Sequence, residues 1–240
     1  MSNTVPRMRI KICGITSPVD GMAAANAGAT AVGLNFYSKS KRFVTAEQAA
    51  DVVELLPSNV SPIGVFVDTN PSKITQACEI AALRGVQLHG QETPAQVAAI
   101  NRKVGEQNLL LAKAIPVNEF TLDDVEKYLT DCLKLRSMPD VFLLDSAIGA
   151  SAGRGEVANW QLAQQMAGLI RTHSTESHNR QSPQIVLAGG LSPANVESAI
   201  DAVKPDGVDV ASGVESSPGV KDAKLMVDFV KATTNAFCQQ

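Results

Sequence analysis

Eight short apolar runs rich in Val, Ile and Leu alternate along the chain with eight longer segments of helical periodicity. Strands that alternate with helices build βαβ units around a parallel sheet. The strands are expected at residues 8–13, 31–36, 62–67, 85–89, 109–114, 140–145, 184–188 and 207–211. The helices are expected at residues 20–27, 46–55, 72–83, 94–103, 123–135, 160–171, 193–203 and 221–232. Because eight such units occupy 240 residues, the sequence predicts an α/β fold, a closed (β/α)8 TIM barrel, rather than an open doubly wound sheet.

No linker-like stretch divides the chain, so residues 1–240 are expected to form a single domain. The one biased segment is a polar insertion at about residues 172–183, between the sixth helix and the seventh strand. Connections of this kind lie on the barrel face away from the active site, so we expect a mobile loop with little bearing on chemistry. Its histidines, His173 and His178, are interpreted as solvated residues rather than metal ligands.

Two helix starts carry recognisable signals. Thr45, with Gln48 three residues later, matches a capping box. Ser192 before Pro193 matches a cap followed by proline in the first helical turn, which predicts a helix from residue 193.

Composition and charge narrow the possible partners. Hydrophobic residues make up 45% of the chain, which is ample apolar material for a core. The formal net charge of −3 argues against nucleic acid as a partner, although net charge does not bear on a single anion-binding pocket. No apolar run approaches the roughly 20 residues that a membrane span needs, and no secretory signal is recognisable. A cytoplasmic protein without membrane association is therefore expected.

The four cysteines, Cys13, Cys78, Cys132 and Cys238, are widely spaced and form no CxxC or Cys/His pattern. The sequence therefore predicts neither a disulfide framework nor a metal site. All except Cys13 are interpreted as small packing residues.

Glycines follow the last two strands, where a barrel of this kind often binds phosphate. The seventh strand leads into Gly189 and Gly190, and the eighth leads into Ser212 and Gly213. Glycine lets the backbone approach an anion closely, so the pattern favours a phosphate site. The alternative is that these glycines only permit tight turns.

Cys13 ends the first strand beside a glycine-containing loop, a position where a thiol can serve as a general base. Strand alternation makes Lys11 face the same way as Cys13. A lysine inside a barrel needs a carboxylate, and Asp209 on the neighbouring eighth strand is the candidate. The alternative is that Lys11 extends to the rim of the barrel.

Three further polar side chains stand at strand ends. Asp145 ends an apolar strand, where a partly desolvated carboxyl would have a raised pKa suited to proton donation; a helix cap or structural ion pair is the alternative. Arg42 lies in a Ser/Lys-rich loop and is either a solvated surface residue or a bidentate grip on a carboxylate. His89 is either a proton shuttle or a hydrogen-bonded rim residue.

Eight stretches follow one another in this order: KICGIT at 11–16, FYSKSKR at 36–42, GVFV at 64–67, VQLHG at 86–90, LD at 144–145, AGGLSPANV at 188–196, VDVASGVE at 208–215 and PGVKD at 218–222. Together they resemble the phosphoribosylanthranilate isomerase family of tryptophan biosynthesis. Two positions depart from the family pattern, because Ala152 stands where glycine is usual and Ala211 replaces a more typical serine.

The resemblance implies a (β/α)8 barrel without metal or organic cofactor and a small phosphorylated substrate. It implies the Amadori rearrangement of N-(5-phosphoribosyl)anthranilate to 1-(2-carboxyphenylamino)-1-deoxyribulose 5-phosphate. The family's catalytic cysteine and aspartate fall on Cys13 and Asp145, and the arginine that holds the anthranilate carboxylate falls on Arg42. The phosphate-binding backbone falls on Gly189, Gly190, Ser212 and Gly213. We group His89 with the substrate-binding residues.

The resemblance also implies a mechanism in which Asp145 protonates the sugar ring oxygen and the Cys13 thiolate removes the C2′ proton. Two alternatives stay open at this point. One is the aminoaldose isomerisation of histidine biosynthesis. The barrels that catalyse it typically use two aspartates, whereas the first strand of this chain ends in Cys13. The other is a non-catalytic phosphate-binding barrel that serves as a scaffold. The protein is expected to be a monomer or a homodimer.

Overall fold

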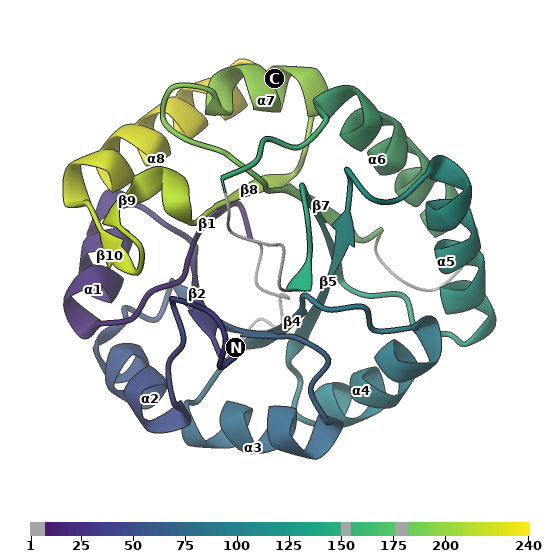
Figure 1. Cartoon of the computed structure of the whole chain (residues 1–240), viewed down its shortest axis with the longest axis horizontal. Coiled ribbons are helices and arrows are strands. Elements are labelled where there is room, and N and C mark those ends of the chain that lie inside the picture. The colour runs from purple at the N-terminus through teal and green to yellow at the C-terminus, as the bar shows by residue number, and fades with distance from the viewer. Residues whose placement is uncertain (1–7, 150–154, 176–181) are drawn as a thin grey trace.

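The computed structural model describes residues 8–149, 155–175 and 182–240, and shows a ring of eight parallel strands surrounded by helices (Figure 1). The strands of the closed barrel, in spatial and chain order, are β1 (Ile10–Cys13), β2 (Ala31–Asn35), β3 (Ser61–Phe66), β4 (Gly85–Leu88), β5 (Leu110–Pro116), β6 (Val141–Asp145), β7 (Gln184–Leu187) and β8 (Gly207–Val210). The predicted (β/α)8 barrel is confirmed. That the whole chain forms one domain stays a prediction.

The outer helices follow the strands in regular alternation. They are α1 (Pro18–Ala27), α2 (Ala46–Leu55), α3 (Pro71–Ile80), α4 (Pro94–Glu106), α5 (Leu122–Lys134), α6 (Trp160–Thr175), α7 (Val196–Val203) and α8 (Ala223–Cys238). The described part of the chain contains no helix with the length and apolarity that crossing a bilayer requires.

Pairing of the first and last strands closes the barrel and sets the register of the site. Lys11 on β1 lies opposite Asp209 on β8, as strand alternation predicts. Parallel strands covered on both sides are apolar along their length, and all seven residues of β5 are buried. Burial on both faces explains why the strands appear in the sequence as continuous apolar runs.

Alternate residues of the strands enter two separate cores. On β6, Phe142 and Leu144 pack outward against the helices, whereas Val141 and Leu143 belong to a smaller cluster inside the barrel. Each such side chain contributes about 1.5–3 kcal/mol when fully buried. The inner cluster fills one part of the barrel interior, and the buried polar side chains of the strands, among them Lys11, Lys113 and Asp209, lie outside this cluster.

The predicted starts of two helices have different outcomes. Thr45 and Gln48 form the expected capping box at the start of α2. The helix predicted from residue 193 instead begins at Val196, because Asn195 folds back into the preceding turn. Its side chain accepts a hydrogen bond from Ser192 N at 2.8 Å and donates one to Gly190 O at 2.9 Å. Residues 193–195 therefore form a turn, and the prediction was wrong by three residues.

The polar insertion begins later than predicted. Residues 172–175 continue helix α6, in which His173 Nδ1 lies 3.0 Å from Leu169 O. His178 and the rest of residues 176–181 lie outside the described residues, so mobility of this insertion stays a prediction.

A short hairpin that the sequence analysis did not anticipate follows β8. A 3₁₀ turn at Ser212–Val214 leads into β9 (Glu215–Ser217), which pairs with β10 (Val220–Lys221). The hairpin delays the last helix, which starts at Ala223 rather than at the predicted residue 221, with Asp222 as its cap. It lies beside α1 and α8 (Figure 1).

Candidate active site

A cavity of about 830 Å³ opens at the carboxyl ends of the strands. Its walls bring together residues from almost every strand end, and those with predicted roles are Cys13, Arg42, His89, Asp145, Gly189, Gly190 and Ser212. Gly213 is not among the lining residues. The thiol and the carboxyl group that the sequence analysis selected therefore face one shared space.

The floor of the cavity holds the predicted ion pair. Lys11 Nζ lies 2.8 Å from Asp209 Oδ2, with the two side chains 0% and 6% exposed. Lys11 does not extend to the rim. Burial lowers the pKa of Lys11, but Asp209 and Cys13 outweigh burial and hold that pKa above its ordinary value. The lysine is therefore a fixed positive charge beneath the thiol.

The Cys13 thiol lies close to the Lys11 ammonium group. A Cβ atom placed at Gly33 would lie 2.6 Å from Cys13 Sγ and 3.0 Å from Lys11 Nζ, so only glycine leaves room there. Burial raises the pKa of Cys13, although Lys11 opposes the rise. The thiol is consequently the resting form at neutral pH, and the adjacent cation stabilises the thiolate when it forms.

Asp145 stands opposite, at the end of β6, with its side chain 14% exposed. Burial raises its pKa to about 6, against the opposing effect of hydrogen bonds from Ser146. The carboxyl group is therefore half protonated at about pH 6 and mostly ionised at pH 7, where roughly a tenth of it still carries the proton that a general acid donates. The predicted rise in pKa is confirmed.

His89 contacts Asp145 and is held from behind by Gln87. Burial, with help from nearby Lys113, lowers the pKa of His89 to about 4, so the imidazole is neutral at pH 7. The Gln87 amide nitrogen can only donate, and it lies 2.8 Å from His89 Nδ1. The imidazole proton is then on Nε2, which lies 3.5 Å from Asp145 Oδ2. His89 presents a neutral donor to the carboxyl group.

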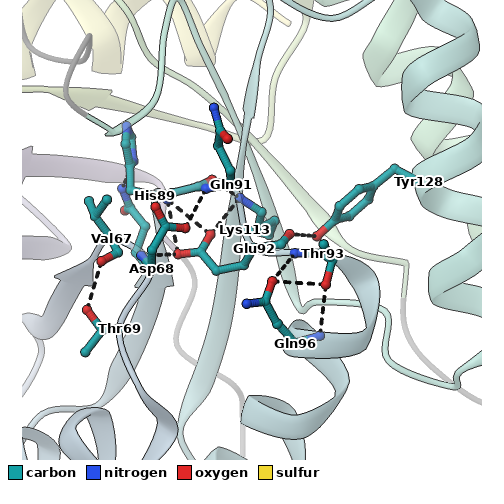
Figure 2. Close-up of polar contacts among 12 residues, drawn as sticks. Val67, Asp68, Thr69, His89, Gln91, Glu92, Thr93, Gln96, Lys113 and Tyr128 are labelled. Atoms are coloured by element: carbon teal, nitrogen blue, oxygen red, sulfur yellow. Dashed lines mark hydrogen bonds and ion pairs between the residues drawn. The ribbon is translucent and has the colours of Figure 1, made fainter.

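A buried ion pair fixes the turn that carries His89 (Figure 2). Glu92 lies 3.0 Å from Lys113 Nζ, with both side chains at most 3% exposed, and it accepts hydrogen bonds from Asp68 N and Gly90 N. Lys113 also donates to Gly90 O at 2.8 Å. The ends of β3 and β4 and the middle of β5 are thereby joined around one carboxylate, which limits movement of the neighbouring His89.

Arg42 is neither free nor a solvated surface residue. Its Nε and Nη2 atoms each donate to one oxygen of Glu215 at 2.7 Å. Glu215 also accepts from Lys221 Nζ at 2.8 Å. Arg42 does bind a carboxylate with two hydrogen bonds, but this carboxylate belongs to Glu215 of the protein itself, so contact of Arg42 with a substrate carboxylate stays a prediction.

The positions after β7 and after β8 require glycine for different physical reasons. Gly189 and Gly190 have φ angles of 85° and 65°, and side chains there would collide with Ser146 and Glu156 in the loop after β6. A side chain at Gly213 would collide with the carbonyl oxygen of Leu191. All three glycines thus allow loops to pack closely, and Gly189 and Gly190 also bring their backbone to the cavity wall.

Several polar residues at the site were not singled out from the sequence. They are Gln87, Glu92, Lys113, Glu215, Lys221, Lys39 and Lys41. A charged residue inside an apolar strand, as at Lys113, was a signal that could have been used. Among the described residues, no group of three or more His, Cys, Asp and Glu side chains is placed to hold a metal ion. Ala152 lies outside them, with the rest of residues 150–154.

A family model for N-(5′-phosphoribosyl)anthranilate isomerase matches residues 10–232. The chain is 38% identical over 231 residues to the N-(5′-phosphoribosyl)anthranilate isomerase of Trichlorobacter lovleyi, which covers 95% of this chain and 99% of that protein.

Solved structures agree with the sequence matches. Phosphoribosylanthranilate isomerase from Thermotoga maritima superimposes with a TM-score of 0.77 at 36% identity, covering 95% of this chain and 100% of that one. A phosphoribosylanthranilate isomerase solved in complex with reduced 1-(o-carboxyphenylamino)-1-deoxyribulose 5-phosphate superimposes with a TM-score of 0.74 at 35% identity, with the same coverage.

Proposed function

We propose a general acid/base mechanism for this chain, which belongs to the N-(5′-phosphoribosyl)anthranilate isomerase family and is an intramolecular isomerase of tryptophan biosynthesis. The observation that carries the mechanism is the shared cavity of Cys13 and Asp145, in which a thiol backed by a lysine faces a carboxyl group whose pKa is about 6. The family membership favours this reaction over a non-catalytic scaffold or the histidine-pathway isomerisation.

The substrate is anchored at its two ends. Gly189, Gly190 and Ser212 line the side of the cavity where the barrel fold often binds phosphate, with Gly213 supporting that loop from behind. Arg42 lines the wall formed by the loop after β2 and receives the anthranilate carboxylate. Anchoring both ends holds the reacting sugar carbons between Cys13 and Asp145.

The floor of the cavity supplies acceptors for the sugar hydroxyls. Asp209 Oδ1 and Gln87 Oε1 are buried and lack a hydrogen-bond partner within the described part of the chain. Both residues line the cavity. Ribose hydroxyl groups would satisfy these oxygens, whose burial without a partner otherwise costs about 1–3 kcal/mol each.

Ring opening is the acid-catalysed step. Asp145 donates its proton to the ring oxygen while the C1′–O bond breaks, and the lone pair of the anthranilate nitrogen forms a C1′=N iminium bond. Asp145 leaves this step as a carboxylate, and His89 Nε2 lies 3.5 Å from its Oδ2 atom. No charge is left on the leaving oxygen.

Proton removal from C2′ is the base-catalysed step. The Cys13 thiolate takes this proton, and the electron pair of the C–H bond forms a C1′=C2′ double bond that neutralises the iminium nitrogen. The resulting enolamine becomes the ketone when its C2′ hydroxyl loses a proton and C1′ gains one. The Asp145 carboxylate takes the hydroxyl proton, and the Cys13 thiol gives its proton to C1′. Asp145 is then again a carboxylic acid and Cys13 again a thiolate.

Replacement of either group tests the mechanism. Cys13→Ala and Asp145→Ala are each expected to lower kcat by about 10²–10⁴-fold, the range of a positioned proton transfer, while the fold is retained. Turnover is followed by the loss of substrate fluorescence. Cys238→Ala is the matched control, because this exposed thiol lies at the far end of α8. Near-wild-type turnover in either catalytic variant would refute the assigned role.

The metal-free, cofactor-free reaction, the cytoplasmic location and the choice between monomer and homodimer remain predictions for this chain. A phosphorylated small molecule as the partner follows from the proposed reaction. A related isomerase from Thermotoga maritima is described as dimeric.

A further inference from the structure

The guanidinium group of Arg42 is fixed on one edge before any substrate arrives. Its Nε and Nη2 atoms bind the two oxygens of Glu215, and the side chains of the pair are only 11% and 4% exposed. The stem of Arg42 packs against Gly14, where a Cβ atom would collide with it. The guanidinium group of Arg42 therefore has one orientation rather than many. Because the edge that binds Glu215 is fixed, the position of its opposite edge is fixed too.

The opposite edge of the guanidinium group is available. Within the described residues, Nη1 of Arg42 has no hydrogen-bond partner, and Nη2 uses only one of its two hydrogens. The two terminal nitrogens of a guanidinium group match the two oxygens of a second carboxylate. Since Arg42 lines the cavity, it can bind Glu215 and a substrate carboxylate at the same time.

Charge is the obstacle to such double binding. Glu215 by itself would cancel the charge of Arg42 and leave a neutral pair facing an anion. Lys221 removes this obstacle, because its ammonium group lies 2.8 Å from Glu215 Oε1 and its side chain is 0% exposed. Two cations and one anion give the cluster a net charge of +1.

Lys221 does not line the cavity, so it acts through the other two residues. It is held by Glu215 and by a hydrogen bond of 2.9 Å to Ala211 O, the residue that precedes the turn after β8. Pairing of β9 with β10 places Lys221 opposite Glu215. The hairpin thus delivers a buried positive charge behind the carboxylate rather than a ligand for the substrate.

We propose that Lys221 is a positioning residue that makes the enzyme specific for an aglycone bearing a carboxylate. By offsetting Glu215, it leaves the oriented Arg42 with a full charge for that carboxylate. This inference rests on the proposed contact between Arg42 and the substrate, which is tested separately below.

Binding of two non-reacting ligands measures this role without the chemical step. One ligand is reduced 1-(o-carboxyphenylamino)-1-deoxyribulose 5-phosphate, and the other is the matching phenylamino compound without the carboxylate. Lys221→Met makes the cluster neutral, and we expect about tenfold weaker binding of the first ligand, or about 1.4 kcal/mol, with the second changed less than about twofold. Calorimetry gives both dissociation constants.

The double variant separates charge from structure. Glu215→Gln combined with Lys221→Met restores a cluster charge of +1, and the glutamine oxygen still accepts a hydrogen bond from Arg42. Most of the lost affinity for the carboxylate ligand should return. If Lys221 were only structural, the double variant would bind at least as weakly as Lys221→Met, and both ligands would be affected equally; either result overturns the proposal.

Controls keep the outcome interpretable. Lys224→Met removes an exposed lysine three residues away and should change neither constant. Arg42→Met should weaken binding of the carboxylate ligand only. An equal loss of affinity for both ligands would refute the contact between Arg42 and the substrate. A selective loss in Arg42→Met, with no effect of Lys221→Met, would refute only the role of Lys221. If Lys221→Met does not fold, Glu215→Gln alone tests the proposal. Its cluster charge of +2 should tighten binding of the carboxylate ligand and leave binding of the other ligand unchanged.

Discussion

The cavity shifts the pKa values of Cys13 and Asp145 in the same direction, because burial disfavours the charged form of both. The proposed mechanism, however, needs the cysteine charged and the aspartic acid neutral. Near neutral pH the prevailing form of the pair is thiol with carboxylate, since Asp145 titrates at about 6 and Cys13 above its ordinary value. The active form also carries a single proton, but on Asp145 instead of Cys13. The rate is therefore limited by the fraction of molecules in which the proton is on Asp145.

A bell-shaped pH dependence of kcat/KM follows. Below about pH 6 both groups become protonated and no base is left, so the rate falls on the acid side. Above the raised pKa of Cys13 both protons are lost, and the rate falls again. Stopped-flow measurement across this range checks the shape. In Asp145→Asn the acid limb near pH 6 should disappear from the residual activity, and its persistence would assign that limb to another group.

The raised pKa of Asp145 also lowers the stability of the fold. Its folded-state pKa of about 6 lies above the ordinary aspartate value of about 3.9, so ionisation costs the folded state up to roughly 3 kcal/mol. This cost is absent below about pH 4, grows as the pH rises, and is complete above about pH 6. Asp145→Asn should therefore unfold at higher urea concentration than wild type at pH 8, and the difference should shrink towards pH 4. A difference that does not depend on pH would contradict this account.

At the scale of elements, the turn between β7 and α7 supports the proposed phosphate loop. Asn195 holds this turn through Ser192 N and Gly190 O, instead of capping the helix with its side chain. The delayed start of α7 therefore shapes the backbone next to Gly189 and Gly190. The polar side chain serves the loop and not the helix.

Asn195→Ala should consequently affect both stability and substrate binding. Loss of two hydrogen bonds is expected to cost about 1–2 kcal/mol in urea unfolding, and release of the loop should raise KM several-fold with little change in kcat. Asn70→Ala is the matched control, because Asn70 does not line the cavity and caps α3 by accepting a hydrogen bond of 2.9 Å from Ser72 N. It should lose similar stability with unchanged KM. An unchanged KM in both variants would refute the role of Asn195 in the loop.

For the whole molecule, the net charge is negative, whereas one wall of the cavity carries three positive charges. The chain carries a formal net charge of −3, whereas the loop after β2 contributes Lys39, Lys41 and Arg42 to the cavity wall. Charges beyond about 8–10 Å are screened at physiological salt, so the local cations control the approach of an anionic substrate. The overall charge has little influence there.

Salt should therefore slow capture of the substrate. Raising NaCl from about 20 to about 200 mM is expected to lower kcat/KM several-fold, because screening weakens the attraction to the local cations. In the Lys39→Gln/Lys41→Gln variant this dependence should flatten. A kcat/KM that rises with salt would show that the net negative charge dominates instead.

The sequence by itself determined the barrel, the approximate strand ends, and the places of Cys13 and Asp145 on them. It could do so because strand and helix periodicity are local properties, and because the order of eight parallel units leaves one closed arrangement. Even the Lys11–Asp209 pair followed, since side-chain alternation and closure between the first and last strands place the two residues opposite each other.

Only the tertiary structure decided how the site is charged and held. Arg42 and Glu215 are 173 positions apart, and neither strand periodicity nor closure of the barrel fixes where two long loop side chains meet. The same holds for the Glu92–Lys113 pair and for the neutral state of His89, which depends on burial among groups from several strands. Ion pairing and pKa values depend on distances and solvent exclusion in three dimensions. They can therefore be assigned only from the structure in which all eight units pack around one cavity.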